Sequence, residues 1–217
     1  MTFKNLKTWL SNSSLPTAWL SIIPVVMATS MAFGDGVQNW TRSAWTLVLA
    51  FLLQIITIDI FELFKEKFLR LKTLLTGIIF GPLLVAGSYY LQSHEMNLAV
   101  FIAGMPLGFL AMNILTLKLH QEITQKRLVL RYLSFTFIAV LMPVIIYGIT
   151  NDHIYSLSAC VVLLMAIKPI TKLFHEDKHS LVHAIVWTKW MALVYGVLFS
   201  IGWLDIIERI LERIWSP

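Results

Sequence analysis

The chain is poor in cysteine and in charge. A single cysteine, Cys160, stands among 217 residues, so no disulfide can form within the chain. Charged residues make up only 13% of the sequence, hydrophobic residues make up 58%, and the mean hydropathy is +0.75. Ordinary soluble domains carry about 25% charged residues. The composition therefore excludes a typical soluble domain and predicts an integral membrane protein.

Long apolar stretches recur along the whole sequence. A stretch of about 20 apolar residues can cross a membrane as a helix, because a helix satisfies its own backbone hydrogen bonds where water is absent. We count seven such stretches, and no linker is long enough to separate soluble domains, so we expect one all-α membrane domain over residues 1–217. The expected spans are Thr17–Phe33, Ser43–Phe64, Leu74–Leu91, Leu98–Leu117, Leu128–Ile149, Tyr155–Ile170 and Trp190–Ile207.

Basic residues occur in alternate connections between these spans, which is typical of loops that stay in the cytoplasm. This pattern predicts a multi-pass protein of the cell membrane with a cytoplasmic N-terminus. The net charge of +5 follows from the same pattern and from contact with anionic lipid, so we expect no nucleic-acid partner. The basic residues concerned are Lys4, Lys7, Lys65, Lys67, Arg70, Lys72, Lys118, Lys126, Arg127, Arg131, Lys168, Lys172, Lys178 and Lys189.

The C-terminal tail, residues 205–217, alternates isoleucine and leucine with glutamate and arginine at a helical period. We expect it to form an amphipathic helix on the outer leaflet of the membrane.

Carboxylates mark the end of the second expected span. Asp59, Glu62 and Glu66 follow one another at steps of three and four residues, which places them on one helical face beside Lys65. Charges at the edge of a membrane helix are costly and are candidates for function, and oxygen ligands suit Mg²⁺. The alternative is a solvated helix end in which the carboxylates pair with neighbouring lysines.

A second polar patch closes the fourth expected span. Glu122 is its only carboxylate, and Lys126 and Arg127 supply positive charge on the same side of the membrane. Taken alone the patch is typical of a basic loop. We expect it to face the first patch across the cytoplasmic end of a helical bundle.

The segment His175–His179 matches the pattern H-E-x-x-H, in which two histidines bind zinc and the glutamate acts as base. No hydrophobic wall surrounds this segment. The alternative is a solvated or headgroup-facing histidine cluster.

Three stretches together resemble a known family. They are Ser21–Val25 (SIIPV), Phe80–Ser93 (FGPLLVAGSYYLQS) and Thr188–Gly202 (TKWMALVYGVLFSIG). These stretches are similar to segments of the UbiA superfamily of membrane prenyltransferases, and most of all to the 1,4-dihydroxy-2-naphthoate polyprenyltransferases of menaquinone biosynthesis. The resemblance implies a UbiA-like helical bundle that transfers an isoprenoid chain from a prenyl diphosphate to an aromatic quinone precursor.

The same resemblance implies roles for individual residues. Asp59, Glu62 and Glu122 would be catalytic residues that hold Mg²⁺, and the diphosphate would lie on Lys65, Lys126 and Arg127. The metal would assist ionisation of the allylic bond, and the aromatic acceptor would then attack the carbocation.

The chain departs from the family pattern at several of these positions. Nine spans are usual and seven are present here, as though one helical hairpin were missing. In the first signature, N-D-x-x-D, Ile58 replaces the asparagine and Glu62 the second aspartate. In the second signature, N-N-x-R-D-x-x-x-D, both asparagines are lost, at Lys118 and Leu119, and Gln121 replaces the arginine. Glu122 replaces the first aspartate and Lys126 the last one.

Loss of one preorganised electrostatic contact can reduce a rate by about 100- to 1000-fold, so these departures leave two interpretations open. The chain is either a divergent Mg²⁺-dependent prenyltransferase or a non-catalytic relative. Such a relative would bind a quinone, an isoprenoid lipid or another membrane protein. A zinc peptidase built on His175 and His179 is a remote third interpretation.

Overall fold

The computed structural model of the protein describes residues 22–37, 39–50, 69–118, 124–150, 154–174 and 178–204. These residues are almost entirely helical and contain no strand, which confirms the all-α prediction for this part of the chain. The elements are α3 (Ile22–Gly34), a helical stretch over residues 40–50, α5 (Leu69–Ile78), the π-helix η3 (Ile79–Leu83), α6 (Leu84–Ser93), α7 (Leu98–Lys118), α8 (Gln125–Thr150), the 3₁₀-helix η5 (Ile154–Val161), α9 (Val162–Leu173) and α10 (Lys178–Trp203).

Within the described ranges, four helices are long and apolar enough to cross a membrane. They are Leu71–Ser93, Leu98–Lys118, Gln125–Thr150 and Ser180–Trp203. The helix α3 is apolar but shorter. The count of seven spans and the cytoplasmic N-terminus stay predictions, and the tail 205–217 lies outside the described residues.

The last helix begins earlier than the sequence predicts. We expected the final span to start at Trp190, yet α10 already begins at Lys178. Polar side chains lower the hydropathy of this first half, but they do not interrupt the helix. The Thr188 hydroxyl, for example, donates to the Ala184 carbonyl, 2.7 Å away and one turn earlier.

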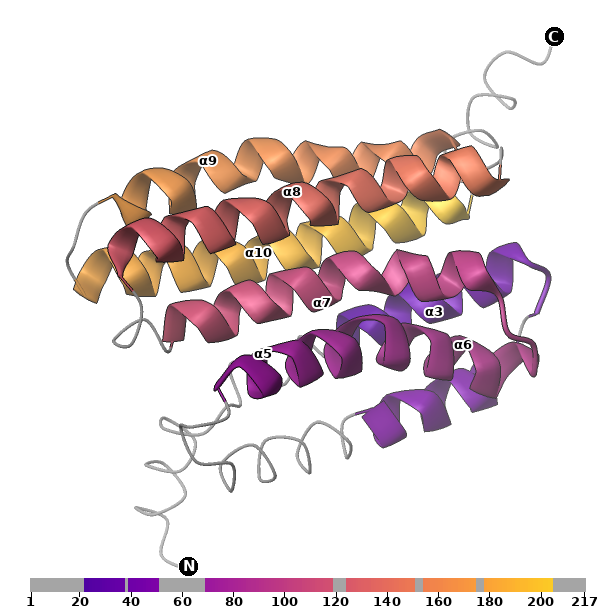
Figure 1. Cartoon of the computed structure of the whole chain (residues 1–217). Helices are drawn as coiled ribbons and strands as arrows, with labels where there is room; N and C mark the ends of the chain where they lie inside the picture. Colours follow the sequence, from indigo (N-terminus) through magenta and orange to yellow (C-terminus); the bar gives the residue numbers. More distant parts are fainter. Residues whose placement is uncertain are drawn as a thin grey trace, which may run out of the picture.

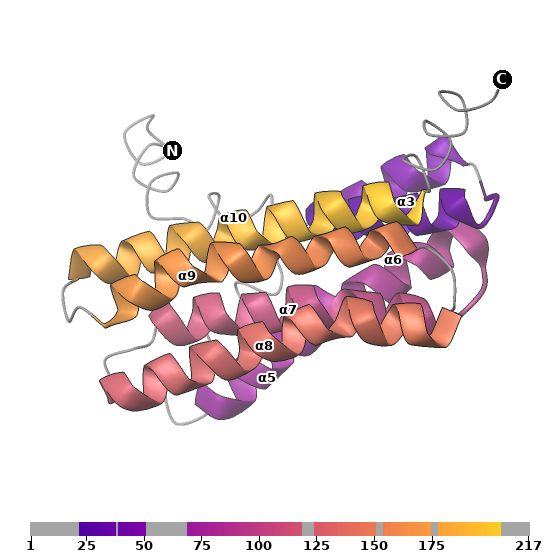
Figure 2. The same ribbon diagram turned by 90° about the horizontal axis from the view of Figure 1, so that it is seen from above.

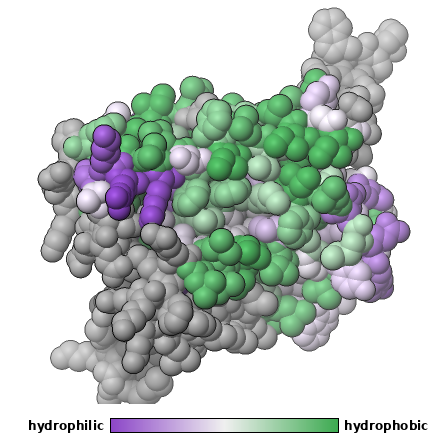
Figure 3. All heavy atoms as spheres, viewed as in Figure 1, coloured by the Kyte–Doolittle hydropathy of each residue, from purple (hydrophilic) through white to green (hydrophobic). Residues whose placement is uncertain are grey.

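The helices run side by side along one long axis, and α7 lies at the centre of the bundle (Figures 1 and 2). It packs against α5, η3 and α6 on one side and against α8 and α10 on the other. The helix α3 covers α6 and α10, and α9 covers α8 and α10. Much of the outer face is apolar, as expected of helices that face lipid (Figure 3).

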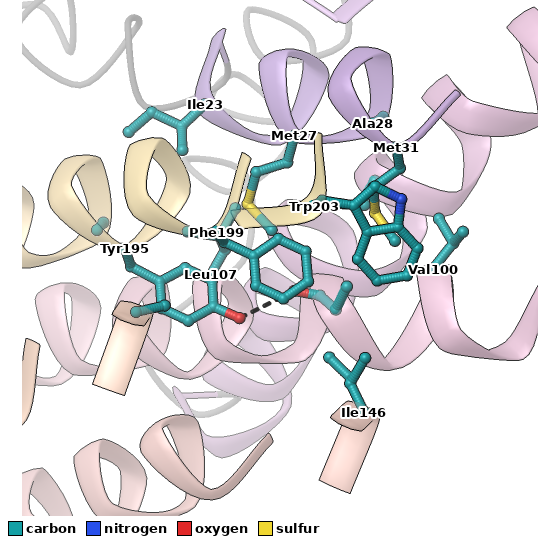
Figure 4. Close-up of a cluster of buried hydrophobic side chains, with 14 of the residues drawn as sticks. Ile23, Met27, Ala28, Met31, Val100, Leu107, Ile146, Tyr195, Phe199 and Trp203 are labelled. Atoms are coloured by element: carbon teal, nitrogen blue, oxygen red, sulfur yellow. Dashed lines mark hydrogen bonds between the residues drawn. The ribbon is translucent and has the colours of Figure 1, made fainter. Parts of the chain in front are cut away.

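Aromatic side chains from α10 form the centre of the largest apolar cluster. Tyr195, Phe199 and Trp203 follow one another at successive turns, with ring centroids 5.8 and 5.7 Å apart. Met27 and Met31 of α3 lie against this row, and all five side chains are at most 2% exposed (Figure 4). The row therefore joins α3 and α10 by close packing of the kind that determines helix association in a membrane.

Two pairs of glycines bring α7 against the segment α5–η3. Gly77 and Gly81 face Gly104 and Gly108, and a Cβ added at Gly81 would lie 2.6 Å from the Gly108 nitrogen. Both pairs have the small-xxx-small spacing that permits close approach of membrane helices. The π-helix turn beside this contact accommodates Pro82, which has no N–H to offer an ordinary α-helical turn.

Candidate functional site

The charged side chains separate to the two ends of the bundle. Among the described residues the only carboxylates are Asp35 and Glu95, which lie with Arg42 at the end where α3 and α6 terminate. The other basic side chains that the structure describes lie at the opposite end, where α5, α8 and α10 begin and α7 and α9 terminate (Figure 1). We call this the basic end; its basic residues are Lys72, Lys118, Lys126, Arg127, Arg131, Lys168, Lys172 and Lys189.

Two of the residues predicted from the sequence to form the site lie at this end. Lys126 and Arg127 are exposed in the first turn of α8. The predicted metal ligands Asp59, Glu62 and Glu122, and the predicted diphosphate ligand Lys65, lie outside the described residues, as does Glu66. Their expected convergence with Lys126 and Arg127 therefore stays a prediction.

The proposed zinc motif lies at the boundary of the described residues. His175 is outside them, and only the backbone of His179 is described. Within the described residues, no group of three or more histidine, cysteine or acidic side chains is arranged to hold a metal ion.

Sequence reasoning did not single out Lys118 and Lys189. Lys118 is the last residue of α7, and Lys189 lies on α10, a helix that packs against α7. Both had been assigned to connections between spans. Lys118 stands where the second signature has an asparagine. This difference was the one signal in the sequence that could have drawn attention to it.

A chain of buried polar side chains crosses from α7 through α8 to α10. The Asn113 amide nitrogen donates to the Thr136 hydroxyl at 3.0 Å and to the Tyr132 carbonyl at 3.4 Å. The Tyr132 hydroxyl lies 2.9 Å from that of Thr188. All four side chains are at most 2% exposed, so the chain links three helices inside the bundle without solvent.

The direction of the bond between Tyr132 and Thr188 follows from the other hydrogen bond of Thr188. Thr188 uses its proton on the Ala184 carbonyl, so the Tyr132 hydroxyl is the donor toward Thr188. The Asn113 Oδ1 atom has no hydrogen-bond partner within the described part of the chain, which leaves one buried acceptor unsatisfied at the start of the series.

Apolar packing holds the helices together beside this polar chain. Leu117, Leu128 and Leu173 form a buried cluster with Ala184, which joins α7, α8, α9 and α10. The Gln125 side chain donates to the Leu173 carbonyl and so ties the start of α8 to the end of α9. The backbone positions of Lys118 and Lys189 are thereby fixed relative to each other.

One further contact orders a basic side chain at this end. The Lys168 ammonium lies 4.2 Å from the centre of the Trp187 ring, which joins α9 to α10 by a cation–π interaction. The Lys168 charge is therefore held against α10.

The opposite end is closed by a polar hub at Gln92, which is 1% exposed. Its amide nitrogen donates to Thr29 at 3.0 Å, its amide oxygen accepts from Ser43 at 2.9 Å, and its backbone carbonyl accepts from Arg42 at 3.0 Å. Beside it the Tyr89 hydroxyl donates to the exposed Asp35 carboxylate at 2.6 Å. These bonds tie α6 to α3 and to the helical residues 40–50.

The stretches that carry the family resemblance fall on described helices apart from Ser21, because Ile22–Val25 form the start of α3. Phe80–Ser93 forms most of η3 and all of α6, so it contains the glycine contact to α7 and the Gln92 hub. Thr188–Gly202 lies on α10 and contains Lys189 and two residues of the aromatic row. Much of this likeness thus lies in residues that pack the bundle.

The chain was compared with protein families, with curated proteins and with solved structures. None of the three comparisons gives a match.

Proposed function

We propose that the protein is a multi-pass protein of the cell membrane whose basic end faces the cytoplasm. The support is the separation of charge in the described residues, because lysine and arginine are retained on the cytoplasmic side. The connection between α7 and α8 would then lie in the cytoplasm, and α10, which begins at the same end, would run outward and leave the C-terminus outside. An odd number of spans would place the N-terminus on the other side, in the cytoplasm. Reaction of single cysteines introduced at residues 95 and 126, with a reagent that does not cross membranes, tests this in intact cells. Labelling at 126 in place of 95 would contradict the orientation.

We further propose that the protein transfers an isoprenoid chain from a prenyl diphosphate to an aromatic quinone precursor. The observation that carries this proposal is the gathering of cationic side chains at one end of an apolar helical bundle. A prenyl diphosphate has the complementary form, with a polyanionic head and a long apolar tail. The family resemblance supplies the reaction type.

In this proposal Lys126 and Arg127 bind the diphosphate and stabilise the negative charge that develops as it leaves. The allylic carbon–oxygen bond breaks, the aromatic carbon forms the new bond to the allylic carbon, and the ring then loses a proton. The apolar helices exclude water, which would otherwise capture the carbocation.

The described residues of the basic end supply ammonium and guanidinium groups and no carboxylate, so they suit an anion and do not by themselves suit a metal. Asp59, Glu62 and Glu122 are the residues proposed to hold Mg²⁺. When bound, the metal would neutralise part of the diphosphate charge.

Membranes containing the protein provide the test. We expect them to convert labelled prenyl diphosphate and dihydroxynaphthoate to a lipid-soluble product in the presence of Mg²⁺. The variant Glu122→Gln should reduce the rate by about 100-fold or more, which is the size of effect found for single electrostatic contacts. Glu95→Gln is the matched control, because Glu95 is exposed at the opposite end of the bundle. Equal rates for the two variants would remove Glu122 from the site.

No transfer by the unaltered protein, with or without Mg²⁺, would refute the enzyme proposal. The non-catalytic interpretation would then be tested by extracting bound quinone or isoprenoid lipid from the purified protein. The loss of the signature asparagines and arginine is the observation that favours this second candidate.

A further inference from the structure

One cation lies against an aromatic ring where α9 and α10 run side by side (Figure 2). The Lys168 ammonium is 4.2 Å from the centre of the Trp187 ring. Lys168 is exposed on α9, and Trp187 is half-buried on α10. The pair therefore lies on the outer surface of the bundle, at the seam between these two helices.

Buried neighbours fix the backbone on both sides of this contact. On α9, Ala166 is fully buried against the rest of the bundle, and Lys168, two residues later, points to the other side of the helix. On α10, Thr188 follows Trp187, is fully buried and is hydrogen-bonded to the Ala184 carbonyl. Helix packing thus holds the ring in place, and only the flexible lysine stem remains to adjust.

Lys168 lies deeper along α9 than the other lysine of this helix. Five residues separate it from the last residue, Leu173, which is about 7.5 Å along the axis, whereas Lys172 is in the last turn. Val161 and Leu164 precede Lys168 on the same helical face and are 50% and 67% exposed, and we call them the apolar stripe. The Lys168 ammonium therefore borders a surface that faces lipid, where an uncompensated charge is costly.

The Trp187 ring compensates this charge only in part. An aromatic face attracts a cation through its quadrupole but carries no net charge, so the pair retains one positive charge. An ammonium group also has three donors, and a ring face offers no lone pair to accept from them. The phosphate of a phospholipid supplies both the opposite charge and the acceptor oxygens, and its acyl chains match the apolar stripe.

We propose that Lys168 and Trp187 form a binding site for one phospholipid of the leaflet at the basic end. The Lys168 ammonium donates to a phosphate oxygen while the Trp187 ring holds it from α10, and an acyl chain lies along the apolar stripe. An anionic phospholipid such as phosphatidylglycerol fits best, because the phosphate of phosphatidylcholine already has a cation in its own headgroup. The site does not depend on prenyl transfer.

The experiment measures binding of dioleoylphosphatidylglycerol to the purified, delipidated full chain in detergent by native mass spectrometry. The measured quantity is the dissociation constant of the first lipid bound. Lys168→Met, which keeps an unbranched stem and removes the charge, should weaken binding by about 10-fold, the loss expected for one charge-assisted hydrogen bond. Lys168→Arg should retain most of the affinity, because a guanidinium group also binds phosphate and stacks on aromatic rings.

The matched control is Lys172→Met, which removes an exposed charge one turn nearer to the end of the same helix and should change the dissociation constant far less. Trp187→Leu removes the ring and should weaken binding more than Trp187→Phe, which keeps an aromatic face. Equal thermal unfolding of all variants shows that loss of binding is not loss of fold.

Unchanged binding in Lys168→Met overturns the proposal, and so do equal losses in Lys168→Met and Lys172→Met, which would show only a general attraction of the basic end for anionic lipid. Dioleoylglycerol has the same chains and no phosphate, so binding as tight as that of the phospholipid would overturn the role of the phosphate. Glycerol 3-phosphate has no chains, and equally tight binding would overturn the role of the apolar stripe. Tighter binding of phosphatidylcholine would overturn the preference for an anionic headgroup.

Discussion

The glycine contact between α7 and the η3 segment gives a sharp test of the packing. A Cβ at Gly104 would lie 2.8 Å from both the Gly81 oxygen and the Pro82 Cα. Ordinary contacts of this kind begin at 3.4 Å, so Gly104→Ala requires the two backbones to separate by several tenths of an ångström. Neither neighbour is a flexible side chain that can rotate away. Overpacking of this type costs about 1–3 kcal/mol.

Alanine also favours a helix over glycine by about 1 kcal/mol, and this gain must be separated from the packing cost. The matched variant is Gly87→Ala on α6, where an added Cβ meets no atom within 4 Å. Both substitutions gain the same helix propensity, and only one of them crowds a neighbouring helix. The difference between the two variants therefore isolates the packing cost, which we expect to be about 1–3 kcal/mol.

The assay is reversible unfolding in mixed micelles, followed by circular dichroism as the fraction of denaturing detergent is raised. We expect Gly87→Ala to unfold at the same or a higher detergent fraction than the unaltered protein, and Gly104→Ala at a lower one. Equal free energies of unfolding for the two variants, within about 0.5 kcal/mol, would refute the contact between these helices.

Two further pairs of variants test the buried hydrogen bonds. Thr136→Val should destabilise the protein by about 1–2 kcal/mol, because it removes the nearer of the two acceptors of the Asn113 amide nitrogen. Asn113→Leu removes both the donor and the unsatisfied oxygen, so the same unfolding assay should show a smaller loss; a larger loss would contradict the assigned bonds. Gln92→Leu should cost more than Tyr89→Phe, since it removes the bonds to buried Ser43 and to partly buried Thr29, whereas the exposed Asp35 carboxylate can be solvated. The reverse order in thermal unfolding would show that the Gln92 hub is not formed.

The membrane class and the helical character could be predicted from the sequence because both depend on runs of neighbouring residues. Runs of apolar residues such as Leu98–Leu117 have the length of a bilayer and few charges, and the structure places α7 over nearly the same range. The start of α10 was missed because Thr188 and Lys189 lower local hydropathy, although the helix satisfies Thr188 within its own backbone.

The candidate site was less accessible to sequence reasoning than the fold. Lys126 and Arg127 were recognised as a local basic patch, and the structure places them at the basic end. The hydrogen bond between Tyr132 and Thr188 depends on how α8 and α10 lie relative to each other. Helices that are apolar on nearly every face carry little information about which face meets which neighbour. The pairing of partners far apart in sequence therefore had to come from the structure.

The wide turn at η3 sets the rotational position of α6, which follows it in the same continuous helical segment. Leu84 N–H reaches back to the Ile79 carbonyl, one residue further than in an α-helix, which inserts an extra residue into the winding. If the same residues were wound as a regular α-helix, α6 would be rotated by about 100° relative to the glycine face upstream. Tyr89 and Gln92 would then point away from α3. The extra residue in this turn therefore lets one continuous helix present Gly81 to α7 and Gln92 to α3.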